Sequence, residues 1–427
     1  MKPKPMIRLI YTLILAVASP ILLLGLYKKK PGKPSVGSRW KEHFGCTPKL
    51  SNPNARPVWI HAVSVGEVIA ISPLIRQLKQ QQPETTIVLT TTTPTGAEQA
   101  SKLGEWVEHR YMPIDFGFAV SGFIKAIQPQ ALYIVETELW PNTLHKVAQA
   151  GIPISVINAR LSERSYQRYA KFQSVFDLVS KNLTTLLCQY QDDAERFIRL
   201  GVDAEKVFVT GSIKFDIQVD PTALTQGQAL RQPIGQRPVW IAASTHEGED
   251  LPIIKAHQTL LKSHPNALLI LVPRHPERFN AVANLVSQQG LTIVTRTSGE
   301  TITPNTQVYL ADTMGEMMSM LSAADICFMG GSLLGDKVGG HNLLEPAEIG
   351  MPMLTGPSYF NFKDISEQLI ALRACQVVET PEAIAKAVEG LIDSETDRIE
   401  QGRNAKAFVR QSKGAVGRTI EILDKRG

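Results

Sequence analysis

Apolar and polar positions divide the chain into a long apolar segment at its start and a body in which two patterns alternate. Leu9 to Tyr27 is a run of 19 residues without a charged side chain. As a helix it would be about 28 Å long, close to the hydrocarbon thickness of a bilayer, which is about 30 Å. The run predicts an uncleaved N-terminal membrane anchor, either single-pass or monotopic. A cleaved signal peptide is the alternative, because Ala16-Val17-Ala18 resembles a cleavage site, but the apolar run continues beyond it.

In the body, short apolar runs typical of buried strands are separated by longer amphipathic runs typical of helices. The strand candidates are residues 58–62, 86–90, 131–135 and 154–157 in the first half, and residues 239–243, 267–272, 307–310 and 326–329 in the second. This alternation predicts α/β structure, with parallel sheets covered by helices on both faces. We expect two doubly wound, Rossmann-like domains facing a cleft, with ligands at the carboxyl ends of the strands.

A segment rich in Gln, Pro and Gly, with weak periodicity, separates the two halves at residues 218–238 and is interpreted as the interdomain linker. The predicted organisation is a membrane anchor with a basic flank at residues 1–35, a first domain at 36–217, and a second domain with C-terminal helices at 239–427. Two domains agree with a length of 427 residues. The four cysteines lie far apart without a C-x-x-C pair, which argues against a disulfide scaffold or zinc site and fits a reducing compartment.

The net charge of +5 is unevenly distributed, because residues 1–49 hold ten Lys and Arg against a single acid, Glu42. The basicity therefore flanks the apolar run, and it does not predict nucleic-acid binding by the body. Six Lys and Arg follow the run, from Lys28 to Lys41, and three precede it, so the positive-inside rule places the body in the cytoplasm. The same patch would attract anionic headgroups. A helix face formed by Arg160, Arg164, Arg168 and Lys171 is either a solvated surface or a further site for anionic lipid.

Carboxylates and a lysine directly follow strand candidates in the first half. Glu67 comes after residues 58–62, where it could take a proton from an attacking hydroxyl or merely complement a helix dipole. A helix N-terminus there would favour its ionised form and make it a weaker base. Glu136 and Glu138 follow residues 131–135 and would point to one side if the strand continued. Lys214 suits an anion, with a plain surface lysine as the alternative.

The second half offers three strand ends suited to an anionic ligand. Arg274 closes residues 267–272 with a guanidinium that fits phosphate or carboxylate. Residues 312–317 form one strand-to-helix turn, and residues 330–332 with 339–346 form a Gly-rich one, whose free N–H groups would bind an anion. Glu345 would accept a ribose hydroxyl or complement a helix dipole. The absence of G-x-x-x-x-G-K-[ST], and of G-x-G-x-x-G after a strand, argues against NTPase and dinucleotide-binding functions.

Six features in this order resemble the transferases of 3-deoxy-D-manno-oct-2-ulosonic acid (Kdo) in lipopolysaccharide synthesis. They are the apolar N-terminus, S-V-G-E at 64–67, E-T-E-L-W-P at 136–141, P-R-H-P-E-R at 273–278, D-T-M-G-E at 312–316 and G-G-H-N-x-L-E at 339–345. The resemblance covers nearly the full chain. It implies a GT-B fold and inverting transfer of Kdo from CMP-Kdo to the lipid A precursor lipid IVA. It also implies no metal and no cofactor, and a location at the bacterial inner membrane.

Matched to this sequence, the family's catalytic base is Glu67, and its charge-stabilising residues are Glu136 and Lys214. Its contacts to the CMP of the donor match Pro273, Arg274, Met314, Gly315, Glu316, Asn342, Leu343, Leu344 and Glu345. Where many members have N-P-L-E, this chain has Leu343 as the second residue, which a main-chain contact would tolerate. The alternatives are a nucleotide-sugar epimerase of the same architecture, which would need no lipid anchor, and a non-catalytic nucleotide-binding membrane protein.

Overall fold

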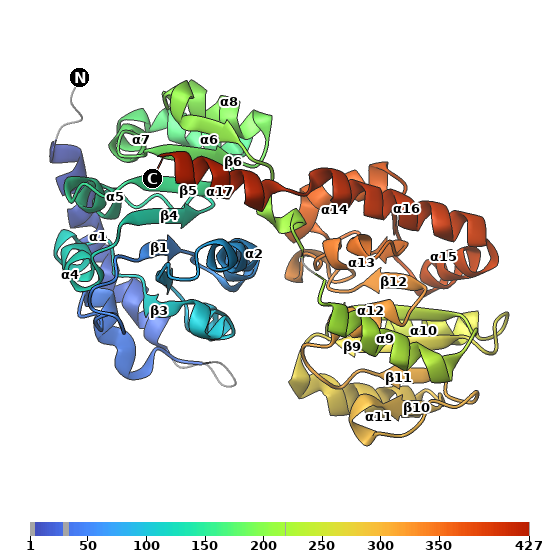
Figure 1. The fold of residues 1–427 in the computed structure, drawn as a ribbon. Helices are drawn as coiled ribbons and strands as arrows, with labels where there is room; N and C mark the ends of the chain where they lie inside the picture. Colours follow the sequence, from blue (N-terminus) through green and yellow to red (C-terminus); the bar gives the residue numbers. More distant parts are fainter. Residues whose placement is uncertain (1–4, 29–33, 218, 427) are drawn as a thin grey trace. The chain divides into compact units, whose positions relative to one another are not determined.

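The computed structural model describes residues 5–28, 34–217 and 219–426, and the chain forms two compact units (Figure 1). The first unit contains Met1–Asp216 together with Ser412–Gly427, and the second contains Ile217–Gln411. Among the described residues, each unit holds one seven-stranded sheet in which neighbouring strands pair in parallel. The α/β organisation predicted from the sequence is confirmed.

The sheet of the first unit has the strand order β3-β2-β1-β4-β5-β6-β7. Its strands are β1 (Val58–His61), β2 (Ile87–Thr91), β3 (Glu108–Tyr111), β4 (Ala131–Val135), β5 (Ile154–Ala159), β6 (Thr185–Cys188) and β7 (Val207–Val209). The central strands β1, β2, β4 and β5 are buried along their whole length, as their continuous apolar runs require. The order reverses at β1, and a doubly wound sheet binds ligands at such a switch point, beyond the carboxyl ends of its strands.

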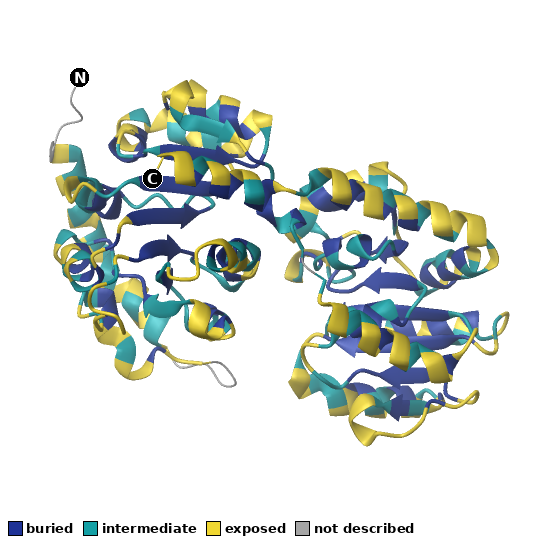
Figure 2. Ribbon diagram, in the orientation of Figure 1, coloured by how far each residue is buried: buried dark blue, intermediate teal, exposed yellow. Residues whose placement is uncertain are grey.

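Helices cover both faces of this sheet, with their buried sides toward the strands (Figure 2). One core joins the sheet to α2 (Val65–Gln81), α3 (Pro94–Ser101) and α17 (Ala415–Arg426). The other joins it to α4 (Gly117–Ile127), α5 (Pro141–Gln149), α7 (Gln173–Ser180) and α8 (Gln191–Arg199), and α6 (Glu163–Lys171) packs on α7. Trp59 and Phe176 are fully buried in this second core.

The second unit repeats the plan with the strand order β10-β11-β9-β8-β12-β13-β14. Its strands are β8 (Val239–Thr245), β9 (Leu268–Pro273), β10 (Ile293–Thr295), β11 (Val308–Leu310), β12 (Ile326–Met329), β13 (Met353–Thr355) and β14 (Cys375–Val377). Its helices are α9 (Pro221–Ile234), α10 (Asp250–Leu260), α11 (Phe279–Gln288), α12 (Met317–Ser322), α13 (Leu344–Glu348), α14 (Lys363–Ala371), α15 (Pro381–Asp393) and α16 (Glu395–Ser412).

The segment expected to be a linker forms a helix, α9, for most of its length. Asp220 caps this helix by accepting from Thr222 N, and Pro221 occupies the first turn, where a missing N–H costs nothing. The helix packs against α12 so closely that a Cβ on Gly227 would lie 1.7 Å from Ser322 Oγ. Close packing of this kind needs glycine, a residue that weakens the helical pattern in the sequence.

The last helix, α17, packs in the first unit, although the sequence analysis places it in the second domain. Asp216 accepts from Gly414 N at 2.6 Å and from Val416 N at 2.5 Å, which caps the start of α17. Arg418 Nε donates to Thr210 O at 2.8 Å. An amphipathic pattern identifies a helix with one buried face, but it does not identify the core that buries that face.

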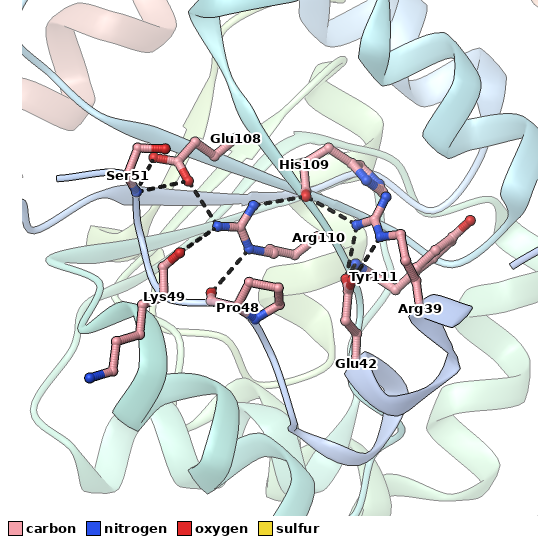
Figure 3. Close-up of polar contacts among 9 residues, drawn as sticks. All are labelled: Arg39, Glu42, Pro48, Lys49, Ser51, Glu108, His109, Arg110 and Tyr111. Atoms are coloured by element: carbon pink, nitrogen blue, oxygen red, sulfur yellow. Dashed lines mark hydrogen bonds and ion pairs between the residues drawn. The ribbon is translucent and has the colours of Figure 1, made fainter. Parts of the chain in front are cut away.

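The apolar N-terminal segment is a single helix, α1 (Pro5–Tyr27), whose residues Met6–Tyr27 are long and apolar enough to cross a membrane by length and composition. Residues 37–51, which begin with the 3-10 helix η1 (Gly37–Phe44), contact the edge strand β3 (Figure 3). Buried Glu42 pairs with Arg39 at 2.7 Å and accepts from Tyr111 N at 2.7 Å. Arg110 donates to the carbonyls of Pro48 and Lys49.

Candidate functional site

Glu67 lies in the first turn of α2, just beyond the carboxyl end of β1. Ser64 is the N-cap of this helix: its hydroxyl accepts from Glu67 N at 3.4 Å and donates to Glu67 Oε1 at 3.2 Å. The pair differs from a capping box, because the Glu67 carboxylate meets the hydroxyl of the N-cap residue and not its backbone N–H. Glu67 Oε2 also accepts from Val63 N at 2.8 Å. These bonds fix the carboxylate at the helix start. Glu67 therefore has a structural role in the first turn of α2, whether or not it also has a catalytic one.

The environment of Glu67 raises its pKa to about 7. Burial is the largest cause, and the negative charges of Glu136 and Glu138 act in the same direction. The bonds from Val63 N–H and the Ser64 hydroxyl lower the pKa and only partly offset the burial. The expectation that the helix N-terminus would leave Glu67 a weak base is wrong, because burial outweighs the helix.

Glu136 directly follows β4 and forms an ion pair with Lys214, at 2.9 Å between Oε1 and Nζ. Its backbone adopts a left-handed conformation with φ +61°, which is uncommon for a residue other than glycine. Backbone strain of this kind clusters at functional sites. The strand ends at Val135, so the condition for an alternation of Glu136 and Glu138 along a continuing strand is not met. Glu138 instead accepts from Trp140 Nε1 at 3.2 Å.

Lys214 lies on the short 3-10 helix η4 (Ile213–Phe215), which Asn158 holds in place. Asn158 Oδ1 accepts from Ile213 N at 3.1 Å, and Asn158 itself has a left-handed φ of +54° near the carboxyl end of β5. The structure therefore brings together three of the predicted residues, Glu67, Glu136 and Lys214. Asn158 was not predicted, because its only signal in the sequence is an asparagine at a strand end.

In the second unit, Arg274 follows β9 with an exposed side chain, and its N–H donates to Thr245 O at 2.9 Å. Glu345 is half-buried on α13, and loss of solvent around its carboxyl raises the pKa of that group, while Asn342 and the charge of Arg274 act against that rise. The side chains of Leu343 and Leu344 are buried in the core, so only the main chain of these two residues can reach a ligand.

Three histidines gather beside Arg274, and none of them was predicted. His246 follows β8, and its Nε2 lies 2.8 Å from Nε2 of His341, with the two rings stacked. His275 packs edge-on against His246. Burial lowers the pKa of His341 to about 4, so the imidazole is neutral at pH 7 and one ring of the pair donates to the other. The sequence feature that could have predicted this cluster is a histidine after β8, another after β9 and a third in the loop after β12.

The Gly-rich turn after β12 does not offer free N–H groups, contrary to the prediction for residues 330–332. The buried carboxylate of Glu249 accepts from Gly331 N, Ser332 N and Leu333 N at 2.7 to 3.0 Å, and from His246 N at 2.9 Å. These amides form an anion-binding nest of the predicted kind. A side chain of the protein occupies it.

Met314, Gly315 and Glu316 form the turn between β11 and α12. Gly315 has φ +88°, so the turn needs its glycine. Arg296 pairs with Glu316 at 2.9 Å and lowers the pKa of that carboxyl. The carboxylate of Glu316 is thus paired with Arg296. We therefore expect a ligand to contact the main chain of this turn and not that carboxylate.

Two doubly wound parallel sheets of seven strands define a GT-B type fold. At the carboxyl edge of the first sheet, Glu67 and the Glu136–Lys214 ion pair form an arrangement typical of an enzyme site. The same fold is seen in UDP-GlcNAc 2-epimerase of Neisseria meningitidis, which is 15% identical, with a TM-score of 0.56 over 86% of this chain and 100% of that one. A family model described as 3-deoxy-D-manno-octulosonic-acid transferase (kdotransferase) matches residues 38–217.

Two curated proteins of that name are similar over almost the whole chain. The 3-deoxy-D-manno-octulosonic acid transferase of Haemophilus influenzae is 41% identical, over 97% of this chain and 98% of its own length. That of Bordetella pertussis is 32% identical, over the same shares of the two chains. The chain belongs to the 3-deoxy-D-manno-octulosonic acid transferase family, and it is a Kdo transferase. The resemblance found in the sequence is confirmed.

Proposed function

We propose that this chain transfers Kdo from CMP-Kdo to lipid IVA, with inversion at the anomeric carbon and without a metal ion, at the cytoplasmic side of the inner membrane. The observation that carries the proposal is Glu67, a positioned carboxylate whose pKa is raised to about 7 beside the Glu136–Lys214 ion pair. Family membership supports Kdo as the group transferred. The fold alone would fit an epimerase equally well.

Glu67 is the proposed general base. An acceptor hydroxyl has a high pKa, so it needs a base within hydrogen-bond reach as it attacks. A carboxylate with a pKa near the working pH combines a large ionised fraction with the strongest available basicity. The bonds from Val63 and Ser64 fix the carboxylate, so little reorganisation is needed before attack.

Lys214 is the proposed cation for the negative charge of the sugar. Kdo carries a carboxylate, and the ammonium of Lys214 would compensate that charge, while Glu136 holds the ammonium in place at 2.9 Å. Inverting transfer is a single displacement, so the base and the departing CMP lie on opposite sides of the anomeric carbon and no covalent sugar–enzyme intermediate forms.

The CMP group is assigned to the second unit. Arg274 would meet its phosphate, and the main chain at Met314–Glu316 and Asn342–Glu345 would contact the nucleotide. The neutral His246–His341 pair lies beside Arg274 and presents hydrogen-bonding groups without adding a charge. Phosphate stabilisation at this place lowers the energy of the leaving group.

The test is transfer itself. Purified full-length protein in detergent is incubated with CMP-Kdo and lipid IVA, and mass spectrometry of the lipid then shows the added mass of Kdo and counts the units. NMR of the product reports the anomeric configuration, and a parallel reaction with EDTA tests the need for a metal. Unmodified lipid IVA in the presence of intact protein would overturn the acceptor assignment. Isomerisation of a UDP-sugar without any lipid would favour the epimerase.

A further inference from the structure

Three hydrogen bonds, at two places along its length, hold the N-terminal helix α1 against the rest of the first unit. Tyr11 donates its hydroxyl proton to Asp115 Oδ2 at 2.9 Å, and Asn142 Nδ2 donates to Thr12 Oγ1 at 3.0 Å. Near the other end of the helix, Tyr27 Oη lies 2.9 Å from His43 Nδ1. The helix also packs on α5 and α7, beside which Figure 1 shows it.

The partners of the two tyrosines belong to one small region of the folded unit. His43 O accepts from Ile114 N at 2.8 Å, directly before Asp115. Asp115 is fully buried and also accepts from the N–H groups of Asn142 and Thr143, so it is a fixed part of the α5 N-terminus. Breaking its bond to Tyr11 would leave a buried carboxylate with one hydrogen-bond partner fewer, which is unfavourable.

This attachment is incompatible with a helix that crosses the bilayer. Tyr11 and Tyr27 are about 24 Å apart along a helix, which is most of the hydrocarbon thickness. A crossing helix would place them near opposite surfaces of the membrane. Both contact the same folded unit, whose buried carboxylate and backbone could not follow into lipid. The two ends of α1 therefore lie on one side of the membrane.

The residues of α1 alternate in exposure with a helical period. The less exposed positions include 8, 11, 12, 15, 18, 19, 23, 26 and 27, and they carry the polar residues Tyr11, Thr12, Ser19 and Tyr27 toward the body. The opposite face is apolar and exposed, and consists of Leu9, Ile10, Leu13, Ile14, Val17, Ile21 and Leu24. Val17, at its middle, is 80% exposed.

Other helices on the same side of the sheet as α1 also carry exposed aromatic and basic residues. Phe118 on α4 and Phe172 at the start of α7 are each 64% exposed, and both helices cover the same side of the sheet. The adjacent helix α6 carries the exposed side chains of Arg164, Arg168 and Lys171. Apolar residues bordered by cations fit a bilayer surface with anionic headgroups.

We infer that α1 is a monotopic anchor: it lies in the plane of an anionic bilayer surface, with its apolar face in the lipid and its polar face on the first unit. The partner is the bilayer, and the inference does not depend on which sugar or acceptor the enzyme uses. It also gives the basic face of α6 a role as a headgroup contact.

The first experiment maps which side of the membrane each end of α1 reaches. Cys46 is replaced by Ser in the full chain, and Lys2→Cys or Ser101→Cys is added, the former before the apolar run and the latter on α3 as a reference for the body. An impermeant maleimide is applied to inverted inner-membrane vesicles and to intact spheroplasts. Both cysteines should react in the inverted vesicles and neither in the spheroplasts. Labelling of Lys2→Cys only in spheroplasts would mean a crossing helix and overturn the inference.

The second experiment measures depth. A fluorescent probe is attached to Leu9→Cys, Val17→Cys or Leu24→Cys in the same background, in vesicles of phosphatidylethanolamine and phosphatidylglycerol. Lipids brominated near the headgroup or near the chain end quench it. An in-plane helix gives all three probes the same quenching ratio, whereas a crossing helix makes Val17→Cys the deepest. Three unquenched probes would mean that a second copy of the chain covers the face. Either of the last two results contradicts the inference, whether or not Kdo transfer is observed.

Discussion

At the scale of single residues, the proposed transfer of Kdo depends on the environment that the fold gives the Glu67 carboxylate. This carboxylate accepts from the Ser64 hydroxyl and from Val63 N at the start of α2, and it is also the proposed base. The two roles respond differently to one substitution. The oxygen of a glutamine can still accept from Val63 N and its NH₂ can donate to the Ser64 hydroxyl, but glutamine does not take a proton at neutral pH.

We expect Glu67→Gln to lower turnover on the order of 10²-fold or more while the protein remains folded. Rates of Kdo transfer to lipid IVA, together with circular dichroism, measure the two effects. CMP affinity should change little, because the nucleotide is assigned to the second unit. Glu163→Gln, on the exposed surface of α6, is the matched control. Near wild-type transfer by Glu67→Gln would place the base elsewhere, with Glu136 or Glu138 next to be tested.

The raised pKa of Glu67 predicts the pH dependence of catalysis. The base works only when ionised, so kcat/KM should rise with pH and level off above an apparent pKa of about 7. Glu138 contributes to that pKa through its negative charge. The variant Glu138→Gln removes the charge, and the acid limb of the pH–rate profile should move to lower pH. An unchanged acid limb in Glu138→Gln would mean that the ionisation of Glu67 does not set the pH–rate profile.

The raised pKa of Glu67 also predicts how the free energy of unfolding changes with pH. The folded protein binds the proton of Glu67 more tightly than the unfolded chain, whose carboxyl has an ordinary pKa of 4.5. This residue therefore lowers stability progressively as the pH rises from 4.5 to about 7. We expect Glu67→Gln to remove that loss, so denaturant unfolding at pH 5 and pH 8 should differ less in the variant than in the wild type. A larger difference would contradict the shift.

At the scale of elements, loops at the carboxyl ends of strands are held by buried polar side chains. Glu249 is the clearest case, because its two oxygens accept four N–H groups from two loops. The glutamine amide has a single acceptor oxygen, and its NH₂ would face two N–H donors.

We predict that Glu249→Gln destabilises the second unit by about 2–5 kcal/mol, as expected for several buried groups left without partners. Thermal unfolding measured by circular dichroism should show a lower Tm than in Glu247→Gln, an exposed neighbour with the same charge change. Equal Tm values for the two variants would mean that the bonds to Glu249 contribute no net stability.

The sequence predicts elements well where one pattern decides them. The buried runs of β1, β4, β8 and β9 could be found because a strand covered on both faces is apolar throughout. The end of β4 could not be predicted, because the left-handed backbone conformation at Glu136 is stabilised by its surroundings. The contact between Glu249 and the turn after β12 could not be predicted either, since 82 residues separate Glu249 from Gly331. Such contacts depend on tertiary structure that no local pattern records.

At the scale of the whole molecule, CMP alone can test the proposal that the first unit holds the base and the second unit binds the nucleotide. CMP should protect the amides of Met314–Glu316 and Asn342–Glu345 from hydrogen exchange, because the turn at Gly315 and the start of α13 are the main-chain contacts proposed for it. Hydrogen-exchange mass spectrometry of the full chain measures this. Protection confined to residues before 218 would assign CMP to the other unit.

The return of α17 to the first unit has a consequence for synthesis on the ribosome. Its residues Val416, Ile420 and Leu423 complete the core on one face of the first sheet. That core remains open while roughly two hundred residues of the second unit are translated, and it closes only after α17 emerges. Helix α1, the proposed anchor, precedes the rest of the first unit in the chain and is therefore translated before it. If α1 meets lipid during translation, it does so before the unit that holds it is complete, so a chain truncated before Ala415 would reach the bilayer with its first unit unfinished.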